Sequence, residues 1–197
     1  MNVMVFSFGS FNPITFYHLR MLEIAKQFVE IKYQPKNIFG LLRVYDPYST
    51  DEDIKHRLNM VDLAIDDETW MYTSKWNMEQ PSMVKILDKY SKDFDHLKII
   101  LLCDSNVVKQ FTREIKKVLQ KYNVIIFSKS EDSQLDAIVE SLPEFVDRIS
   151  ILKDDTFSGL NSEFVRRLIR NDITIDYTTP KSVIKYISKK GLYRDDN

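Results

Sequence analysis

Apolar residues along the chain form two kinds of pattern, which alternate. Continuous apolar runs of about strand length, rich in β-branched and aromatic residues, cover residues 3–8, 38–44, 98–103, 123–127 and 148–152. Elsewhere apolar residues recur every three or four positions, which predicts helices over residues 16–28, 54–65, 82–90, 114–122, 132–141, 161–170 and 180–190. Buried strands that alternate with amphipathic helices indicate an α/β protein.

This order of elements predicts a mainly parallel sheet, because a crossover helix returns the chain to the same end of the sheet. We therefore expect a Rossmann-like, doubly wound α/β fold with helices on both faces of the sheet. Residues 1–197 are predicted to form a single domain, since no repeat, Gly/Ser linker or low-complexity tract divides them. In such folds ligands bind beyond the carboxyl ends of the strands.

Composition narrows the choice of partner. Lys and Arg number 28 against 29 Asp and Glu, so no overall positive field attracts nucleic acid or an anionic membrane. The apolar start lacks a basic region and reaches a glycine after eight residues, too short for a signal peptide or a membrane span. The single cysteine, Cys103, and three histidines without paired spacing argue against disulfides and structural zinc. We expect a small-molecule partner and a cytoplasmic or nuclear location; a homo-oligomer is compatible with the sequence.

The candidate chemistry follows the first strand, in the sequence Gly9-Ser10-Phe11-Asn12-Pro13-Ile14-Thr15. Thr15 is a suitable N-cap for the next helix, whose unpaired amides and dipole favour a phosphate at this point. Gly9 lets the backbone approach an anion closely. His18 shares a helix face with Thr15, and its imidazole can donate to a phosphate oxygen. The alternative is a plain turn at Gly9, a capping Thr15 and a surface His18.

The string from Gly9 to His18 resembles the nucleotidyltransferase signature, in particular that of eukaryotic nicotinamide mononucleotide adenylyltransferases. The similarity continues at residues 19–23, 56–64, 101–103, 165–167 and 177–193, and at Trp70 and Trp76. It implies an enzyme of NAD biosynthesis that joins ATP to nicotinamide or nicotinate mononucleotide, giving NAD or its deamido form and pyrophosphate. Magnesium would accompany the phosphates, with no metal ligands supplied by the protein.

The resemblance also implies roles for particular residues. His18 and Arg166 would be catalytic, the first steadying the transferred phosphorus and the second contacting phosphate. Nucleotide binding would involve Gly9, Ser10, Phe11, Thr15, Trp76, Asp104, Asn161 and Ser162. Trp76 would lie beside the pyridine ring, and the helices from about residue 161 would complete the phosphate site. An exposed helix arginine and a core tryptophan are the alternatives for Arg166 and Trp76.

Several positions depart from the family pattern. Asp104-Ser105-Asn106 stands where the family has Gly-Ala-Asp, and a lysine-rich loop that reaches ATP is replaced by a segment containing acidic residues 51–53. The candidates for a cation that takes the place of this missing loop lysine are Lys55, Arg43 and Arg113. Glu163 occupies a threonine position of the late phosphate motif, where it would either repel a triphosphate or turn away within the first helical turn.

Two functions of different classes therefore remain. The first is an active adenylyltransferase, favoured because Gly9, His18 and Arg166 are retained. The second is a catalytically weak or inactive relative that binds nucleotide or acts as a chaperone-like protein-interaction module, favoured by Glu163 and the acidic run. A further option keeps the fold but changes the reaction, to cytidylyl transfer or to adenylyl transfer onto phosphopantetheine.

Overall fold

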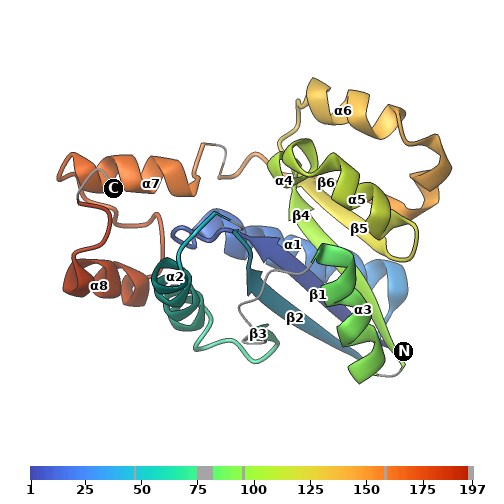
Figure 1. Ribbon diagram of the computed structural model, residues 1–197, viewed down its shortest axis with the longest axis horizontal. Helices are drawn as coiled ribbons and strands as arrows, with labels where there is room; N and C mark the ends of the chain where they lie inside the picture. Colours follow the sequence, from blue (N-terminus) through green and yellow to red (C-terminus); the bar gives the residue numbers. More distant parts are fainter. Residues whose placement is uncertain (47, 75–81, 95, 158, 195–197) are drawn as a thin grey trace.

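The computed structural model describes residues 1–46, 48–74, 82–94, 96–157 and 159–194, and within them all strands form one parallel sheet (Figure 1). The strands are β1 (Asn2–Gly9), β2 (Asn37–Val44), β3 (Met71–Thr73), β4 (Leu97–Asp104), β5 (Asn123–Ser128) and β6 (Ile149–Lys153). Their order across the sheet is β3-β2-β1-β4-β5-β6, which is the order of a doubly wound fold. The predicted fold class is confirmed.

Helices cover both faces of this sheet. One face carries α1 (Phe16–Tyr33), α2 (Asp51–Ala64), α7 (Ser162–Arg170) and α8 (Lys181–Lys190). The other carries α3 (Met83–Asp93), α4 (Ser105–Gln110), α5 (Thr112–Leu119), α6 (Ser133–Glu140) and the 3-10 helix η1 (Pro143–Arg148). In the part of the chain that the structure describes, none of these helices combines the length and apolar character that a membrane span requires.

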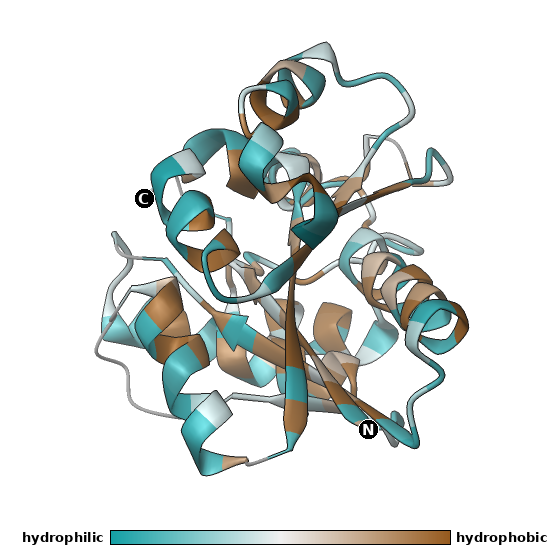
Figure 2. Ribbon diagram, turned by 90° about the vertical axis from the view of Figure 1, so that its right-hand side faces the viewer, coloured by the Kyte–Doolittle hydropathy of each residue, from teal (hydrophilic) through white to brown (hydrophobic). Residues whose placement is uncertain are grey.

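The core consists of two apolar layers separated by the sheet. Val3 and Val5 of β1 pack on the α1 side, whereas Met4 and Phe6 pack on the α3 side, as expected for side chains that alternate along a strand. Both layers are fully or nearly fully buried, and the central strands are apolar over most of their length (Figure 2). This explains why the strands were visible in the sequence as continuous apolar runs.

Some elements differ from the sequence prediction. The structure adds β3, α4 and η1, all of which are too short to show a clear periodicity. It also starts α2 at Asp51 rather than at residue 54, with Thr50 as N-cap accepting a hydrogen bond from the Asp53 amide at 3.2 Å. The acidic residues 51–53 thus belong to the first turn of a helix, where negative charge is favourable, and not to a loop.

The fold itself indicates where a ligand binds. The order of the strands reverses at β1, whose neighbours are β2 on one side and β4 on the other. Because the chain leaves β1 and β4 toward opposite faces, their carboxyl ends are not covered by a crossover and a crevice forms between them. The residues of interest are therefore those just after Gly9, Val44 and Asp104.

Gly40 of β2 provides a test of the packing. A Cβ atom at this position would lie 2.7 Å from Cζ3 of Trp70 and 3.1 Å from Cγ of Met71. We expect Gly40→Ala to lower the free energy of unfolding by about 1–3 kcal/mol through overpacking. Urea denaturation measures this cost. The substitution should cost less in a Trp70→Leu background, and an equal cost in both backgrounds would show that the indole ring is not the obstacle.

Candidate functional site

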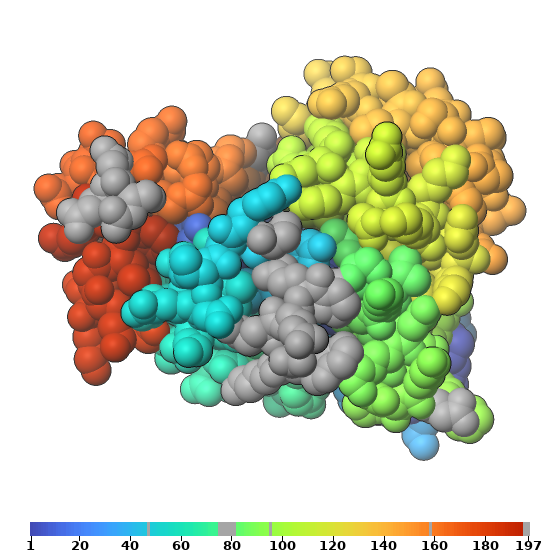
Figure 3. Space-filling model, viewed as in Figure 1, coloured from blue at the N-terminus to red at the C-terminus, as the bar shows by residue number. Residues whose placement is uncertain are grey.

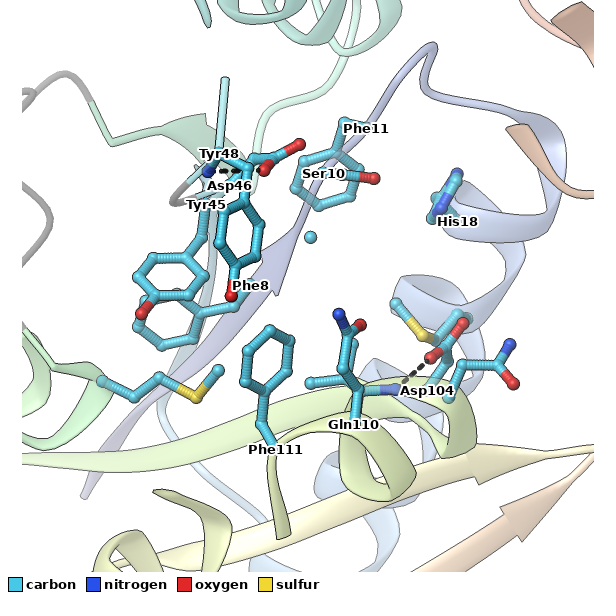
Figure 4. A pocket seen from close by; sticks show the side chains of 15 residues that line it. Phe8, Ser10, Phe11, His18, Tyr45, Asp46, Tyr48, Asp104, Gln110 and Phe111 are labelled. Atoms are coloured by element: carbon cyan, nitrogen blue, oxygen red, sulfur yellow. Dashed lines mark hydrogen bonds between the residues drawn. The ribbon is translucent and has the colours of Figure 1, made fainter. Parts of the chain in front are cut away.

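A cavity of about 490 Å³, here called the strand-end pocket, lies at the carboxyl ends of the central strands (Figure 4). Phe8 and Gly9 of β1 line it together with Tyr45, Asp46 and Asp104, which follow or end the neighbouring strands. This is the position that the reversal of strand order indicates for a ligand. The cavity is large enough for part of a nucleotide, since ligand pockets commonly measure about 300–1,000 Å³.

The strand-end pocket has an aromatic end. Tyr45 makes edge-to-face contacts with Phe8 and Phe111, with ring centroids 5.8 and 6.3 Å apart. Met83 of α3 is also among the residues that line the cavity. Flat aromatic and thioether surfaces favour an aromatic ring as the ligand.

The turn after β1 forms a wall of the pocket, and its conformation depends on Gly9. Phe11 has a positive φ of 42° and is 1% exposed, with its ring folded back over Gly9. A Cβ atom on Gly9 would lie 2.9 Å from Cζ of Phe11. Glycine is therefore required here for the packing of Phe11, in addition to the close approach of an anion that the sequence suggested.

The C-terminal segment holds this turn from the side away from β1. The Ser162 hydroxyl donates to the Pro13 carbonyl oxygen at 2.8 Å, and the Tyr193 hydroxyl donates to Oδ1 of Asn12 at 2.7 Å. α8 also packs directly on α2, which is visible as contact between the red and cyan atoms in Figure 3. Residues far apart in the sequence thus hold the turn through hydrogen bonds.

His18 lines the strand-end pocket from the first turn of α1 (Figure 4). Its Nδ1 accepts a hydrogen bond from the Thr15 amide at 3.0 Å and lies 2.9 Å from the Thr15 hydroxyl. Because a backbone N–H can only donate, Nδ1 carries no proton and the neutral ring is protonated at Nε2. Burial lowers the pKa of His18 from 6.5 to about 4. The ring is therefore neutral at pH 7, with Nε2–H as its donor.

This lowered pKa predicts a pH dependence of stability. Since His18 binds a proton less readily in the folded than in the unfolded protein, its contribution to stability is complete above pH 6.5 and is lost as the pH falls toward 4. We expect the difference in unfolding free energy between wild type and His18→Asn to shrink over this range. Chemical denaturation at several pH values measures it, and a constant difference from pH 7 to pH 4 would contradict the assignment.

Arg166 lies on the far side of the turn. Its Nη1 donates to the Asn12 carbonyl oxygen at 2.6 Å, and its Nη2 forms an ion pair with Glu163. Glu163 also pairs with Arg170 at 3.1 Å, and 62% of its side chain is exposed. The carboxylate that the sequence placed either against the phosphates or away from them is thus bound to two arginines of its own helix, Arg166 and Arg170.

Asp104 has a structural partner as well as a place in the pocket. Its side chain caps α4 by accepting a hydrogen bond from the Val107 amide at 3.0 Å. Burial raises the pKa of Asp104 above the usual carboxyl value, although the hydrogen bond from Val107 opposes this shift. The residue that departs from the family's glycine is therefore held by a helix that the sequence did not predict.

Only some of the site residues predicted from the sequence line the strand-end pocket. The strand-end pocket brings together Gly9, Ser10, Phe11, His18 and Asp104. Thr15 is fully buried as the N-cap of α1, where it positions His18, and Asn161 caps α7 by accepting from the Phe164 amide at 2.8 Å. Trp76 lies outside the described residues. The three candidate replacement cations, Lys55, Arg43 and Arg113, line neither this pocket nor the cavity around Arg166.

Arg57 of α2 contacts the turn after β1 more closely than its place in the sequence indicated. Its side chain is buried, and its Nη1 donates to Asp46 at 2.7 Å while Nη2 donates to the Ser49 hydroxyl at 2.7 Å. Nη1 also lies 3.5 Å from the Ser10 carbonyl oxygen, which places the guanidinium against the turn. The His56-Arg57 pair lay in a stretch of family resemblance, and this was the signal available.

Comparison with known proteins agrees with this geometry. The model of the family described as cytidylyltransferase-like matches residues 6–179. Nicotinamide/nicotinic acid mononucleotide adenylyltransferase 2 of Caenorhabditis elegans is 28% identical over 223 residues, covering 98% of each chain. A probable nicotinate-nucleotide adenylyltransferase of Caldicellulosiruptor saccharolyticus is 27% identical and covers 99% of this chain and 100% of its own.

Solved structures support the fold. The nicotinic acid mononucleotide adenylyltransferase of Plasmodium falciparum, determined in complex with NaAD, matches with a TM-score of 0.72 at 18% identity and covers 98% of this chain and 97% of its own. A putative nicotinate-nucleotide adenylyltransferase from Vibrio parahaemolyticus matches with a TM-score of 0.68 at 15% identity, covering 99% and 97% of the two chains. The fold is thus shared with both structures.

Proposed function

The chain belongs to the cytidylyltransferase-like family, and from this premise we propose that it is an adenylyltransferase acting on ATP and a pyridine mononucleotide. The observation that carries the proposal is the strand-end pocket, in which the turn after β1 and the neutral imidazole of His18 line a cavity with an aromatic end. Relatives that match over nearly their whole length bear this activity in their names, with either the amide or the acid mononucleotide.

The reaction needs no nucleophile from the protein. A phosphate oxygen of the mononucleotide forms a bond to the α-phosphorus of ATP, and the bond between that phosphorus and the bridging oxygen to the β-phosphate breaks. Pyrophosphate leaves with the electron pair of this bond. The protein's task is to orient the two phosphates and to stabilise the charge that develops between them. We assign the orientation to the turn at residues 10–13, and charge stabilisation to His18 and Arg166.

Further assignments complete the proposal. The aromatic end formed by Phe8, Tyr45 and Phe111 would receive the pyridine ring. The family resemblance implies that Trp76 would contact the same ring. Ser162 and the C-terminal helices would complete the phosphate site through the turn that they hold. The chain would work in the cytoplasm or the nucleus.

Magnesium enters this proposal with ATP. Among the described residues, no group of three or more His, Cys, Asp or Glu side chains gathers to hold a metal ion. Magnesium usually keeps several waters and is bound largely through substrate phosphates, so the phosphates of ATP would supply its ligands here. When bound, the ion would neutralise phosphate charge.

Incubation of the protein with ATP, Mg²⁺ and nicotinamide mononucleotide, followed by chromatography, tests the proposal directly. We expect the dinucleotide and pyrophosphate in equal amounts, with a parallel reaction on nicotinate mononucleotide. Replacing ATP with CTP is the control for cytidylyl transfer. Binding of ATP without any product would instead support a nucleotide-binding module that has lost the reaction.

Glu163 offers a second measurement at this site. Its carboxylate pairs with Arg166, so a nucleotide phosphate must displace it before it can reach the guanidinium. Because exposed ion pairs are weak, we expect Glu163→Thr to tighten ATP binding only about two- to fivefold. Titration calorimetry measures the change, with Glu131→Thr at an exposed site as control. Unchanged affinity would mean that the carboxylate does not compete with ATP.

A further inference from the structure

Positive charge is concentrated near the C-terminal end of the chain. Residues 177–194 contain five Lys and Arg and no Asp or Glu, whereas residues 1–159 contain 20 Lys and Arg against 24 Asp and Glu. The formal net charge of −1 therefore conceals two regions of opposite sign. In space, the basic region belongs to α7 and α8, which form the left-hand end of the molecule in Figures 1 and 3.

The lysines of α8 form a stripe on its outer face. Val183 and Ile187 are buried and pack the helix into the core on the α1 side of the sheet. Lys181, Lys185 and Lys189 recur every four residues on the opposite side of the helix, and all three are exposed. Because a helix rises about 1.5 Å per residue, successive charges lie about 6 Å apart along it. We call these three residues the α8 lysine stripe.

The protein does not neutralise this stripe with its own acids. Among the residues that the structure describes, no carboxylate pairs with any of the three lysines, although many lysines of α3, α4 and α5 have such a partner. Helix stability does not account for Lys181 either. It lies in the first turn of α8, where the helix dipole disfavours positive charge, whereas the first turn of α2 holds three acids.

The loop that leads from α7 to α8 exposes two large apolar side chains. Ile173 is 53% exposed and Tyr177 is 86% exposed, and Tyr177 precedes Lys181 by four residues. A single exposed apolar residue is ordinary on a protein surface. Here, however, both belong to the segment that enters the stripe. Tyrosine is favoured where an apolar phase meets water, because its ring is apolar and its hydroxyl is polar.

We propose that this end of the protein docks on an anionic lipid surface, through the α8 lysine stripe and the loop at Ile173 and Tyr177. Clusters of about four to eight Lys and Arg on one helix or segment are typical of binding to anionic lipids. Lysine acts as a point charge toward a diffuse layer of lipid headgroups, whereas arginine suits the fixed geometry of a single phosphate. The attachment is peripheral and needs no membrane-spanning helix. It does not rest on the proposed function.

Co-sedimentation with vesicles tests the proposal. The vesicles consist of phosphatidylcholine with about one-third phosphatidylserine, and vesicles of phosphatidylcholine alone are the reference. We expect the combined variant Lys181→Gln, Lys185→Gln and Lys189→Gln to lower the partition coefficient about a hundredfold, because each lysine near an anionic surface contributes about a fivefold factor. Wild-type protein that binds both kinds of vesicle equally, or neither, would overturn the proposal.

A second triple variant controls for net charge. Lys85→Gln, Lys89→Gln and Lys92→Gln remove the same charge from α3, which packs on the other face of the sheet and carries acids beside its lysines. This variant should lower the partition coefficient less than about threefold, since its charges are far from the docked surface. Equal losses in the two triple variants would show that overall charge alone matters, against the proposal.

Two measurements do not depend on the glutamine variants. Arginine at all three positions of the stripe keeps the charge and should bind vesicles as the wild type does, and a loss equal to that of the glutamine variant would contradict the proposal. Raising KCl from about 0.05 M to about 0.5 M should release most of the wild-type protein, because salt screens the attraction. Full retention at the higher concentration would be equally contrary.

The last arm separates lipid from nucleic acid. Tyr177→Ser should weaken binding to the anionic vesicles several-fold, and unchanged binding would show that the loop does not touch the lipid surface as proposed. A single-stranded RNA of mixed sequence is titrated in parallel. If the α8 lysine stripe bound this RNA while the vesicles stayed unbound, the surface would be a nucleic-acid site and the proposal would fail.

Discussion

Replacement of His18 with alanine is expected to lower turnover about a hundredfold or more. The imidazole lines the strand-end pocket and is neutral at pH 7, since burial lowers its pKa to about 4. Because Nδ1 accepts from the Thr15 amide, the ring offers Nε2–H as a fixed hydrogen-bond donor. Alanine removes this donor from the place where charge develops on the transferred phosphate. Steady-state turnover with ATP, Mg²⁺ and nicotinamide mononucleotide measures the loss.

The same substitution should have a smaller effect on stability. His18 belongs to a capping interaction with Thr15 at the start of α1, and loss of such a contact costs about 0.5–2 kcal/mol. Thr15→Ala is the matched control, since it removes the capping hydroxyl but keeps the backbone amide that donates to Nδ1 of the imidazole. We expect it to keep most of the turnover that His18→Ala loses. Equal turnover in His18→Ala and wild type would refute the catalytic role.

The neutral form of His18 also shapes the pH profile of the reaction. A histidine that exchanged a proton during catalysis would give a change of rate near its ordinary pKa of 6.5. With the pKa lowered to about 4, the ring keeps the same form from pH 6 to pH 8. We therefore expect no step in turnover from His18 over this range.

The apolar pattern of the sequence was sufficient for most of the fold. Five strands were predicted close to their observed positions, because a strand buried on both faces is a continuous apolar run. β3 was missed because it has three residues, of which Tyr72 is half-exposed. The start of α2 was misplaced because its first turn is acidic and apolar periodicity does not extend into it, although Thr50 and the acids were available as a capping signal.

The site could be predicted only where its residues are adjacent in the sequence. The turn from Gly9 and the position of His18 follow from one ten-residue string, and both line the same pocket. The ion pairs and long-range hydrogen bonds of the site could not be predicted, because the distances between their partners are set by the fold. The pairing of Arg57 with Asp46 and the hydrogen bond from Tyr193 to Asn12, separated by 181 residues, exist only once the sheet has brought the segments together.

Replacement of Arg166 is the other prediction with a large expected effect. We expect Arg166→Ala to lower kcat/KM for ATP about a hundredfold or more, because one charged donor aimed at a phosphate contributes about as much as an oxyanion-hole donor. Its guanidinium is already oriented by the Asn12 carbonyl oxygen at 2.6 Å, so little reorganisation is required when a phosphate replaces Glu163 on Nη2. Initial rates with ATP varied at saturating mononucleotide measure the change.

Two variants separate charge from geometry at this position. Arg166→Lys keeps the positive charge but cannot hold the Asn12 carbonyl oxygen and a phosphate oxygen through a planar fork, so it should recover only a small part of the lost activity. Arg167→Ala removes a neighbouring arginine that lies over the Phe164 ring, and it should leave kcat/KM within twofold of wild type. If Arg166→Ala behaved like Arg167→Ala, Arg166 would be an exposed helix arginine that only supports the turn. Full activity in Arg166→Lys would instead show that the charge alone suffices, and the bond to Asn12 would then have no part in orienting the phosphate.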